Sequence, residues 1–344
     1  MGRFAGVGVA ILAKVLYIPS QMKKLKVGLV FGGKSGEHEV SVLSANSIRN
    51  NLDKKRYQVV DVKIDKKGKW DMAALKKVDV VFPIVHGTFG EDGCLQGLLE
   101  MMDVAYVGAG VLGSAVGMDK EVMKRLFCQA NIPVARFETA KKWEISDVLL
   151  RMIAGELKYP LFVKPANSGS SVGITKAHNM NELKVAVALA GGFDTKILFE
   201  EAIEGREIEC SVLGNKKPEV SVPGEVKPTH EFYDYEAKYI DENGAVLEIP
   251  AKMTKNQIKE VQEMAIRAYR ALDCEGMARV DMFIKSSGKI VLNEINTLPG
   301  FTNISMYPKL WEESGLSYAK LLDRLIQLAL ERKKERDELV RSYK

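Results

Sequence analysis

Acidic side chains between residues 277 and 296 are spaced so that they could bind a metal ion. This stretch contains two β-like runs joined at Ser287 and Gly288, which are typical turn residues. An even-membered loop centred between these two residues places Asp281 directly opposite Glu294 on one face of a hairpin. Two carboxylates that face each other repel, so this arrangement requires a cation between them. A hard divalent ion is the natural candidate, and Mg²⁺ usually binds together with a phosphate-bearing substrate.

The same register places Arg279 opposite Asn296, which adds a cation and an amide oxygen to this face. The alternative is an ordinary solvent-exposed hairpin whose charges have no common function. The rest of the chain decides between the two interpretations.

A Gly- and Ser-rich loop occupies residues 164–173, with the sequence KPANSGSSVG. It joins two strand-like runs rather than opening a helix. Small residues let backbone N–H groups approach phosphate oxygens closely, and Lys164 adds a positive charge at the end of the preceding strand. Such a loop is weak evidence by itself. Beside an acidic hairpin it indicates a nucleoside triphosphate, which requires both a flexible cover and metal ions.

Three further segments place reactive groups at strand ends or in loops. His86 follows the apolar run 78–85, where open α/β sheets place ligand contacts, although a single histidine is as often structural. Glu37 falls in the first turn of a predicted helix, where its carboxylate could hold a substrate ammonium or only complement the helix dipole. The aromatic sequence EFYDYEAKY lies in a long irregular stretch, 223–250, and long loops of this kind tend to be lids.

Two short segments match all or part of a known motif. Residues 28–35 satisfy the P-loop expression G-x-x-x-x-G-K-[ST], but Gly28 lies inside an apolar run that predicts a buried strand. His38 and Glu39 begin a zincin pattern, yet Val42 stands where the second histidine is required. We therefore expect neither a P-loop nor a zincin site.

The elements that carry these groups fall into three α/β blocks. The first alternates strands at 24–33, 57–65 and 78–87 with a helix at 39–53, which predicts half of a doubly wound parallel sheet. The second contains a helix at 119–130, strands near 133–140, 159–166 and 196–203, and a helix at 181–190. The third contains a strand at 205–214, the irregular stretch, a helix at 256–272, the hairpin and a charged C-terminal helix.

Composition indicates a globular protein of two or three domains. The 344 residues are 46% hydrophobic and 28% charged, with a net charge of +5 that is too small and too evenly spread to indicate a nucleic-acid partner. The four cysteines form no C-x-x-C pair and have no histidine at zinc-like spacing, so free thiols in a reducing cytosol are expected. Residues 1–22 have the look of a signal peptide interrupted by Lys14. We expect them to be an extension outside the fold, with Met22 as an alternative start.

Six segments occur in an order that resembles D-alanine-D-alanine ligases of the longer-loop bacterial type: GGKSGEHEVS, FPIVHGTFGEDG, VKPANSGSSVG, FYDYEAKY, ARVD and NEINTLPGFTNISMYP. The resemblance covers residues 23–335. It implies a three-domain α/β ATP-grasp fold with an N-terminal doubly wound parallel sheet. The expected parts are a substrate-binding domain (23–118), a small central domain (119–204) and a C-terminal domain (205–344) with a lid (223–250) and a metal-binding hairpin (277–297).

The resemblance also implies a reaction. ATP would phosphorylate the carboxylate of one D-alanine, and the amine of a second would attack the acyl phosphate to give D-alanyl-D-alanine for peptidoglycan precursors. Two Mg²⁺ ions, replaceable by Mn²⁺, would be held by three residues, Asp281, Glu294 and Asn296. ATP, as co-substrate, would be bound by Lys120, Lys164, Ser171, Glu200, Ile203, Glu207 and Lys238.

At the amino-acid end, the resemblance implies that Glu37, Ser170 and Tyr239 form a hydrogen-bonded triad that binds the first ammonium and closes the site. His86 would lie near the first D-alanine, and Ser305 would receive the second carboxylate. Arg279 and the backbone N–H of Gly300 would stabilise the tetrahedral oxyanion. Tyr239 favours an amine nucleophile, because relatives that make D-alanyl-D-lactate carry histidine at the matching place.

Other functions stay open. Another ATP-grasp carboxylate-amine ligase, such as a D-alanine-D-serine ligase, would keep the metal and phosphate residues but change Glu37, Tyr239 and Ser305. A nucleotide-binding regulatory module would bind ATP without releasing ADP, and a scaffold would give no reason for acids paired across a hairpin. The expected partners are D-alanine, ATP and a second copy of the chain, in a cytoplasmic protein without nucleic-acid or stable membrane association.

Overall fold

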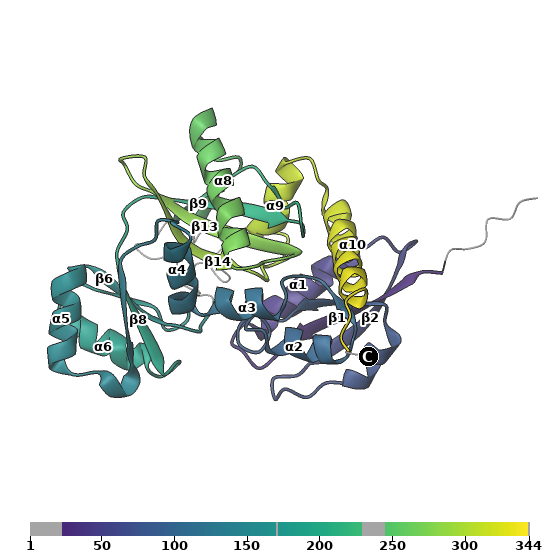
Figure 1. The fold of residues 1–344 in the computed structure, drawn as a ribbon, viewed down its shortest axis with the longest axis horizontal. Helices are drawn as coiled ribbons and strands as arrows, with labels where there is room; N and C mark the ends of the chain where they lie inside the picture. The colour runs from purple at the N-terminus through teal and green to yellow at the C-terminus, as the bar shows by residue number, and fades with distance from the viewer. Residues whose placement is uncertain (1–22, 170, 229–244, 343–344) are drawn as a thin grey trace, which may run out of the picture.

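Three β-sheets and the helices that cover them form the molecule, as seen in a computed structural model that describes residues 23–169, 171–228 and 245–342. In Figure 1 the small sheet lies at one end of the molecule and the N-terminal sheet at the other, while the largest sheet lies between and above them. The chain passes through the N-terminal sheet first, then the small sheet, then the largest one.

The N-terminal sheet is parallel and has the strand order β2-β1-β3-β4. Its strands are β1 (Leu25–Gly32), β2 (Tyr57–Ile64), β3 (Val80–Ile84) and β4 (Ala105–Tyr106), and its helices include α1 (His38–Asn51), α2 (Cys94–Met101) and α3 (Val111–Met118). Parallel strands buried on both faces require nearly continuous apolar runs, and all five residues of β3 are buried. Gly28 lies in the middle of β1, with parallel partners on both sides, so the rejection of the P-loop is confirmed.

The small sheet is antiparallel and has the strand order β5-β8-β6-β7. Its strands are β5 (Phe137–Lys141), β6 (Leu161–Pro165), β7 (Thr175–Ala177) and β8 (Lys196–Glu201). One face packs on α5 (Asp147–Leu157) and α6 (Met180–Ala190) through a core that includes Leu161, Val163 and Phe199. Successive side chains of a strand point to opposite faces of the sheet, so the other face of the small sheet is available to line a site.

The largest sheet has the order β12-β11-β9-β13-β14, with β10 paired to β9. Its strands are β9 (Arg206–Leu213), β10 (Glu219–Val220), β11 (Gly224–Pro228), β12 (Ala245–Glu248), β13 (Met277–Ile284) and β14 (Ile290–Asn296). The interpretation of 223–250 as irregular is wrong at both ends of that stretch, since β11 and β12 pair there as antiparallel strands. Strands this short, one of them ending at Pro228, give a weak period-2 signal.

The hairpin of β13 and β14 has the predicted pairs but a different turn. Asp281 lies opposite Glu294 and Arg279 opposite Asn296, as expected. Near the turn, however, Ile284 pairs with Ile290, so the loop is odd-membered. A bulge between Leu292 and Glu294 shifts the register by one residue and restores the predicted pairs.

The remaining α-helices of the described residues are α4 (Lys120–Gln129), α8 (Lys255–Ala271), α9 (Met306–Glu313) and α10 (Tyr318–Asp337). α4 and α8 pack on the largest sheet through residues such as Phe127 and Val261. The C-terminal helix α10, yellow in Figure 1, packs instead against the N-terminal sheet, where Leu322 and Leu325 share a core with Val27 and Phe82. The C-terminal block thus contributes α10 to the core of the N-terminal sheet. The predicted domain boundaries at 118/119 and 204/205 therefore stay predictions.

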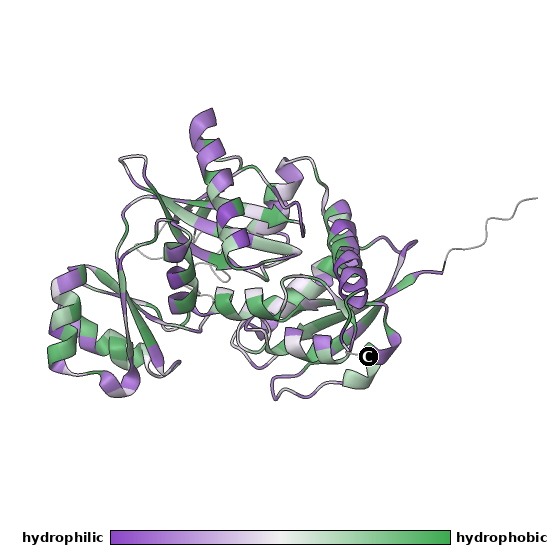
Figure 2. Ribbon diagram, in the orientation of Figure 1, coloured by the Kyte–Doolittle hydropathy of each residue, from purple (hydrophilic) through white to green (hydrophobic). Residues whose placement is uncertain are grey.

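Figure 2 shows strands that are largely hydrophobic and outer helices, such as α8 and α10, that mix the two kinds of residue. Across the described ranges, no helix has both the length and the apolar character needed to cross a membrane. All four cysteines are free thiols, as expected.

Candidate active site

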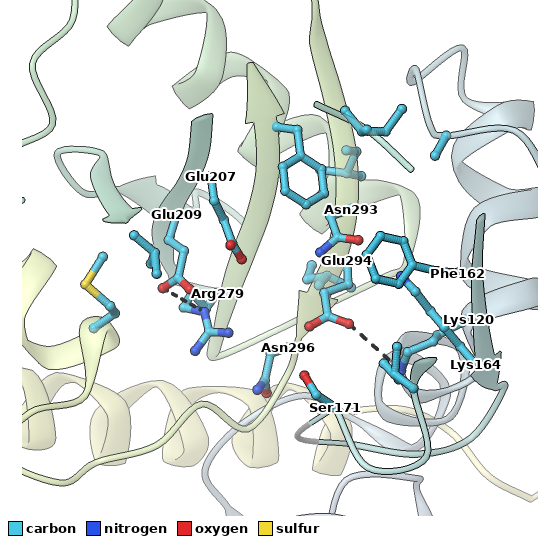
Figure 3. Close-up of a pocket in the computed structure, with 18 of the residues that line it drawn as sticks. Lys120, Phe162, Lys164, Ser171, Glu207, Glu209, Arg279, Asn293, Glu294 and Asn296 are labelled. Atoms are coloured by element: carbon cyan, nitrogen blue, oxygen red, sulfur yellow. Dashed lines mark ion pairs between the residues drawn. The ribbon is translucent and has the colours of Figure 1, made fainter. Parts of the chain in front are cut away.

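A cavity of about 1450 Å³ lies where the three sheets approach one another. Its wall includes His86 after β3, Lys164 at the end of β6, Glu200 on β8, and Glu294 on β14. Figure 3 shows the acidic side chains of the largest sheet and the lysines of α4 and the small sheet pointing toward one another across this space. Groups far apart in the sequence thus meet in one site.

The acidic face of the largest sheet spans three strands. Glu209 on β9 pairs with Asp281 on β13, which pairs in turn with Glu294 on β14. Alternate residues of β13, including Val280 and Met282, are buried in the core behind them. Three carboxylates therefore lie in one row beside the cavity, one more than the hairpin alone predicts.

Arg279 partly neutralises this row. Its Nε and Nη2 atoms donate to the two Asp281 carboxylate oxygens, both over 2.7 Å, and Nε lies 3.0 Å from Glu209 Oε2. Asp281 is only 2% exposed and does not line the cavity, whereas Glu294 does. Of the two acids paired in the hairpin, Glu294 is thus the one that faces the open space.

Lys120 connects the acidic face to the Gly/Ser loop. Its ammonium donates to the carbonyl oxygen of Ser168 over 2.7 Å and lies 3.9 Å from Glu294, the ion pair drawn in Figure 3. Lys120 is the first residue of α4, where the Asp119 carboxylate caps the helix by accepting from two backbone N–H groups. This cap fixes the helix end that carries the lysine.

Two lysines enclose the Glu200 carboxylate on the side of the small sheet. Lys164 donates to Glu200 Oε2 over 2.5 Å, and the Lys124 ammonium pairs with Oε1. Burial would raise the pKa of the Glu200 carboxyl, but the charges of both lysines outweigh burial and hold that pKa below its ordinary value. Glu200 is therefore ionised at neutral pH.

His86, Glu91 and Glu37 form a second buried group in the wall of the cavity. His86 Nδ1 lies 3.6 Å from Glu91 Oε1. Burial lowers the pKa of His86, but the hydrogen bond and charge of Glu91, with the charge of Glu37, raise it above the usual value. Glu37 is 5% exposed, and a Cβ atom at Gly169 would lie 3.1 Å from its Oε2 atom. The Gly/Ser loop therefore packs close to the Glu37 carboxylate.

The turn before α9 supplies backbone groups and a hydroxyl. Ser305 precedes the first residue of α9, and its Oγ atom accepts a hydrogen bond from the Thr302 N–H over 3.0 Å. A Cβ atom at Gly300 would lie 2.8 Å from Ser305 Oγ, so only glycine fits beside that hydroxyl without a shift. A helix N-terminus with a hydroxyl nearby is suited to a carboxylate.

Sequence comparison identifies the family. The model described as the D-ala D-ala ligase C-terminus matches residues 126–327, and that of the N-terminus matches residues 26–76 and 71–109. The D-alanine--D-alanine ligase of Oceanobacillus iheyensis is 48% identical and that of Solibacter usitatus 50%, over 93% and 91% of this chain and 99% and 98% of theirs. The chain belongs to the D-alanine-D-alanine ligase family.

Solved structures of this family have the same fold. The D-alanine-D-alanine ligase from Coxiella burnetii matches with a TM-score of 0.83 and 37% identity, over 92% of this chain and 97% of that one. The VanG D-Ala:D-Ser ligase from Enterococcus faecalis matches with a TM-score of 0.81 and 36% identity, over 89% and 100%. The predicted α/β ATP-grasp fold with an N-terminal parallel sheet is confirmed.

Most of the residues that the family resemblance selects meet in the cavity. Those that line it are Glu37, His86, Lys120, Lys164, Ser171, Glu200, Ile203, Glu207, Arg279, Glu294, Asn296, Gly300 and Ser305. Asp281 lies behind them against Arg279. Ser170, Lys238 and Tyr239 lie outside the described residues. The roles of all these residues stay predictions.

The donor set suits a hard cation that also binds substrate. No group of three or more His, Cys, Asp and Glu side chains in the described ranges is arranged to hold a metal alone. The Glu294 carboxylate and the amide oxygen of Asn296 line the cavity and leave positions for phosphate oxygens and water, as Mg²⁺ prefers, while both carboxylate oxygens of Asp281 accept from Arg279. The residues present therefore fit the ion that the hairpin predicts.

Sequence reasoning missed Glu91, Lys124 and Glu209. The run REIEC places Glu207 and Glu209 two residues apart on a predicted strand, hence on one face, so a signal for Glu209 was present. Lys124 follows Lys120 by one helical turn, and Glu91 stands five residues after His86 in the same loop. Neither spacing reveals a contact with Glu200 or His86.

Proposed function

We propose that this chain joins two D-alanine molecules into D-alanyl-D-alanine, with conversion of ATP to ADP and phosphate. Membership of the family carries ATP use and divalent-metal dependence with it. The observation that carries the proposal is that one cavity holds lysines, oxygen donors, the buried Glu37 carboxylate and the N-terminus of α9. A phosphate donor and two amino acids fit these groups.

The first step is transfer of the γ-phosphoryl group from ATP to the carboxylate of the first D-alanine. Lys120 and Lys164 neutralise phosphate charge, while Glu200, Ile203 and Glu207 hold the nucleoside. Asp281, Glu294 and Asn296 would hold two Mg²⁺ ions, or Mn²⁺ in their place, which would neutralise the charge of the phosphates. The family resemblance assigns further roles to Lys238, Tyr239 and Ser170, which lie outside the described residues.

The first D-alanine is held by its ammonium and lies between Glu37 and His86. Its carboxylate oxygen becomes bonded to phosphorus, ADP leaves, and the carbonyl carbon becomes a good electrophile. The neutral amine of the second D-alanine, whose carboxylate lies at Ser305 and the start of α9, attacks this carbon. Arg279 and the Gly300 N–H stabilise the oxyanion, phosphate leaves with its electron pair, and the amine proton passes to solvent.

The product serves peptidoglycan precursor synthesis in this proposal, and the chain works as a homodimer in the cytoplasm. The similarity to a D-Ala:D-Ser ligase makes D-serine the acceptor that any assay must include. Tyr239 favours an amine over the hydroxyl of D-lactate.

The test is ADP release by the purified chain with ATP and Mg²⁺, comparing D-alanine, L-alanine, and D-alanine mixed with D-serine or D-lactate. Products are identified by mass. Turnover with D-alanine alone that yields its dipeptide supports the proposal. ATP binding without turnover on D-alanine contradicts it, and a mixed dipeptide as the main product indicates a D-serine ligase instead.

A further inference from the structure

Lys124 is a buried lysine outside the residues that line the cavity. It lies on α4 and is 1% exposed. Its ammonium pairs with Glu200 Oε1 and lies 6.0 Å from the centroid of the Phe137 ring. A buried ammonium needs an ionised partner, because leaving it unpaired costs several kcal/mol. Lys124 is thus held to Glu200.

The second lysine on Glu200 is placed differently. Phe162 of β6 pairs with Glu200 of β8, so Lys164, two residues further along β6, reaches back to the same carboxylate. Lys164 lines the cavity and its side chain is 13% exposed. Lys164 can therefore turn toward a ligand, whereas Lys124 cannot.

One carboxylate balances only one of these two ammonium charges. Because Lys124 must keep its partner, the remaining positive charge belongs to Lys164 at the cavity. We propose that Lys124 is a positioning residue: by satisfying Glu200, it leaves the charge of Lys164 available to a phosphate group of ATP. This inference rests on the proposed use of ATP, and it adds a role for a residue that does not touch the nucleotide.

The fold holds Lys124 in place for this role. Met123 and Phe127 anchor α4 in the core of the largest sheet, whereas Glu200 and Lys164 belong to the small sheet. A second ion-pair cluster joins the same two parts, since Lys196 Nζ on β8 lies 2.6 Å from Asp119 and 2.7 Å from Glu121 at the start of α4. Lys124 therefore meets Glu200 from a fixed helix, in a geometry that does not depend on the ligand.

The experiment compares ATP with adenosine. Both bind the nucleoside part of the site, but only ATP offers phosphates to Lys164. In Lys124→Met, Glu200 is left with Lys164 as its partner, which draws that charge away from phosphate. The ratio of ATP to adenosine affinity should fall about tenfold, the size expected for one charge-assisted hydrogen bond. Calorimetric titration with Mg²⁺ present measures both affinities.

Two variants separate charge from structure. Lys124→Arg keeps the charge and should keep the ratio near that of the wild type. The double variant Lys124→Met with Glu200→Gln removes both charges, leaves Lys164 unpaired, and should restore the ratio. Lys142→Met is the matched control, because Lys142 in the same part of the chain donates to the Gly191 carbonyl and does not line the cavity.

Equal losses of ATP and adenosine affinity in Lys124→Met would mean a merely structural role and overturn the inference. An unchanged ratio overturns it as well. If Lys124→Met does not fold, the double variant decides, since a ratio well below wild type there contradicts the inference. A wild-type chain that binds no ATP refutes the proposed function instead, so the two failures are distinguishable.

Discussion

Glu294 connects the acidic row of the largest sheet with the Gly/Ser loop. It belongs to the row of carboxylates on the largest sheet, and it also lies 3.9 Å from Lys120, which holds the Gly/Ser loop through Ser168. Asp281, by contrast, is occupied on both carboxylate oxygens by Arg279. Of the two acids that face each other in the hairpin, Glu294 is therefore the one whose charge most directly meets a ligand.

Replacement of Glu294 by glutamine tests this role. Glu294→Gln keeps the shape of the side chain but removes the charge, so the turnover rate should fall about a hundredfold or more, as expected when several kcal/mol of metal-mediated stabilisation is lost. The unfolding free energy should change little. ADP release and urea unfolding measure the two effects, with Glu138→Gln, an exposed change on β5, as control. A fully active Glu294→Gln would contradict the metal assignment.

His86 gives the site a pH dependence whose sign follows from its surroundings. Burial lowers its pKa, and Glu91 and Glu37 more than offset this, so the folded-state pKa is raised above the ordinary value of 6.5. The resulting stabilisation is complete below the unfolded pKa and is lost as the pH rises through the folded pKa. Glu91→Gln removes the largest favourable contribution.

The expected result is a stability difference between wild type and Glu91→Gln that is larger near about pH 6 than near about pH 9, since only the protonated histidine gains from Glu91. Urea unfolding at both pH values measures it. An NMR titration should also show His86 losing its proton at lower pH in the variant than in the wild type. A difference independent of pH would contradict the assignment of charge to His86.

At this scale, sequence could reveal residue types but not their contacts. Asp281 and Glu294 stand out because hairpin register is a local property. The pairing of Arg279 with Glu209, and of Lys124 with Glu200, joins residues 70 and 76 positions apart, since 279 − 209 = 70 and 200 − 124 = 76. Such pairs depend on strand order and helix packing, which no single stretch of sequence contains.

At the scale of the element, the strand pairs of the hairpin are predicted correctly although its turn is not. The predicted pairs are right, yet the loop is odd-membered and a bulge at Asn293 compensates. Period-2 reasoning counts residues and cannot detect one inserted residue. The bulge also has a consequence for the site, because Asn293 and Glu294 both line the cavity. Figure 3 shows the two side chains next to each other.

The turn of this hairpin and the middle of α5 allow a matched pair of glycine substitutions. Gly288 has φ +82° and open space where a Cβ atom would lie, so Gly288→Ala should lower the unfolding free energy by about 1–2 kcal/mol through backbone strain alone. Gly155 lies inside α5 with equally open space and no positive φ, so Gly155→Ala should raise it by about 0.4–1 kcal/mol. Urea unfolding measures both. Equal effects of the two changes would show that the turn conformation is wrong.

At the scale of the whole molecule, the cavity exists because separate parts of the chain share cores. Phe301 packs edge-on against Phe82 of the N-terminal sheet, with ring centroids 5.7 Å apart, and Tyr318 donates to the Phe301 carbonyl over 2.7 Å. The residue that follows Gly300 is thus fixed by contacts from β3 and α10. Helical periodicity predicts that α10 has an apolar face but not that this face covers the first sheet of the chain.

Arg332 makes the polar contacts between α10 and the end of β4. It is 5% exposed, stacks over the Tyr106 ring at 4.3 Å, and donates to the Tyr106 carbonyl over 2.8 Å and to the Gly108 carbonyl. Arg332→Met keeps apolar bulk but leaves two buried carbonyls without this donor, so the unfolding free energy should fall by about 2–4 kcal/mol. Because no cavity residue is removed, the turnover rate of the folded variant at 25 °C should stay within about twofold of wild type.

Urea unfolding measures the stability of Arg332→Met, and ADP release measures its turnover rate. As a control, Lys334→Met, an exposed change on the same helix, should alter the unfolding free energy by less than about 0.5 kcal/mol. Unchanged stability would show that α10 is held by its apolar contacts alone, and lost turnover in a folded variant would show that α10 controls the site as well as the fold.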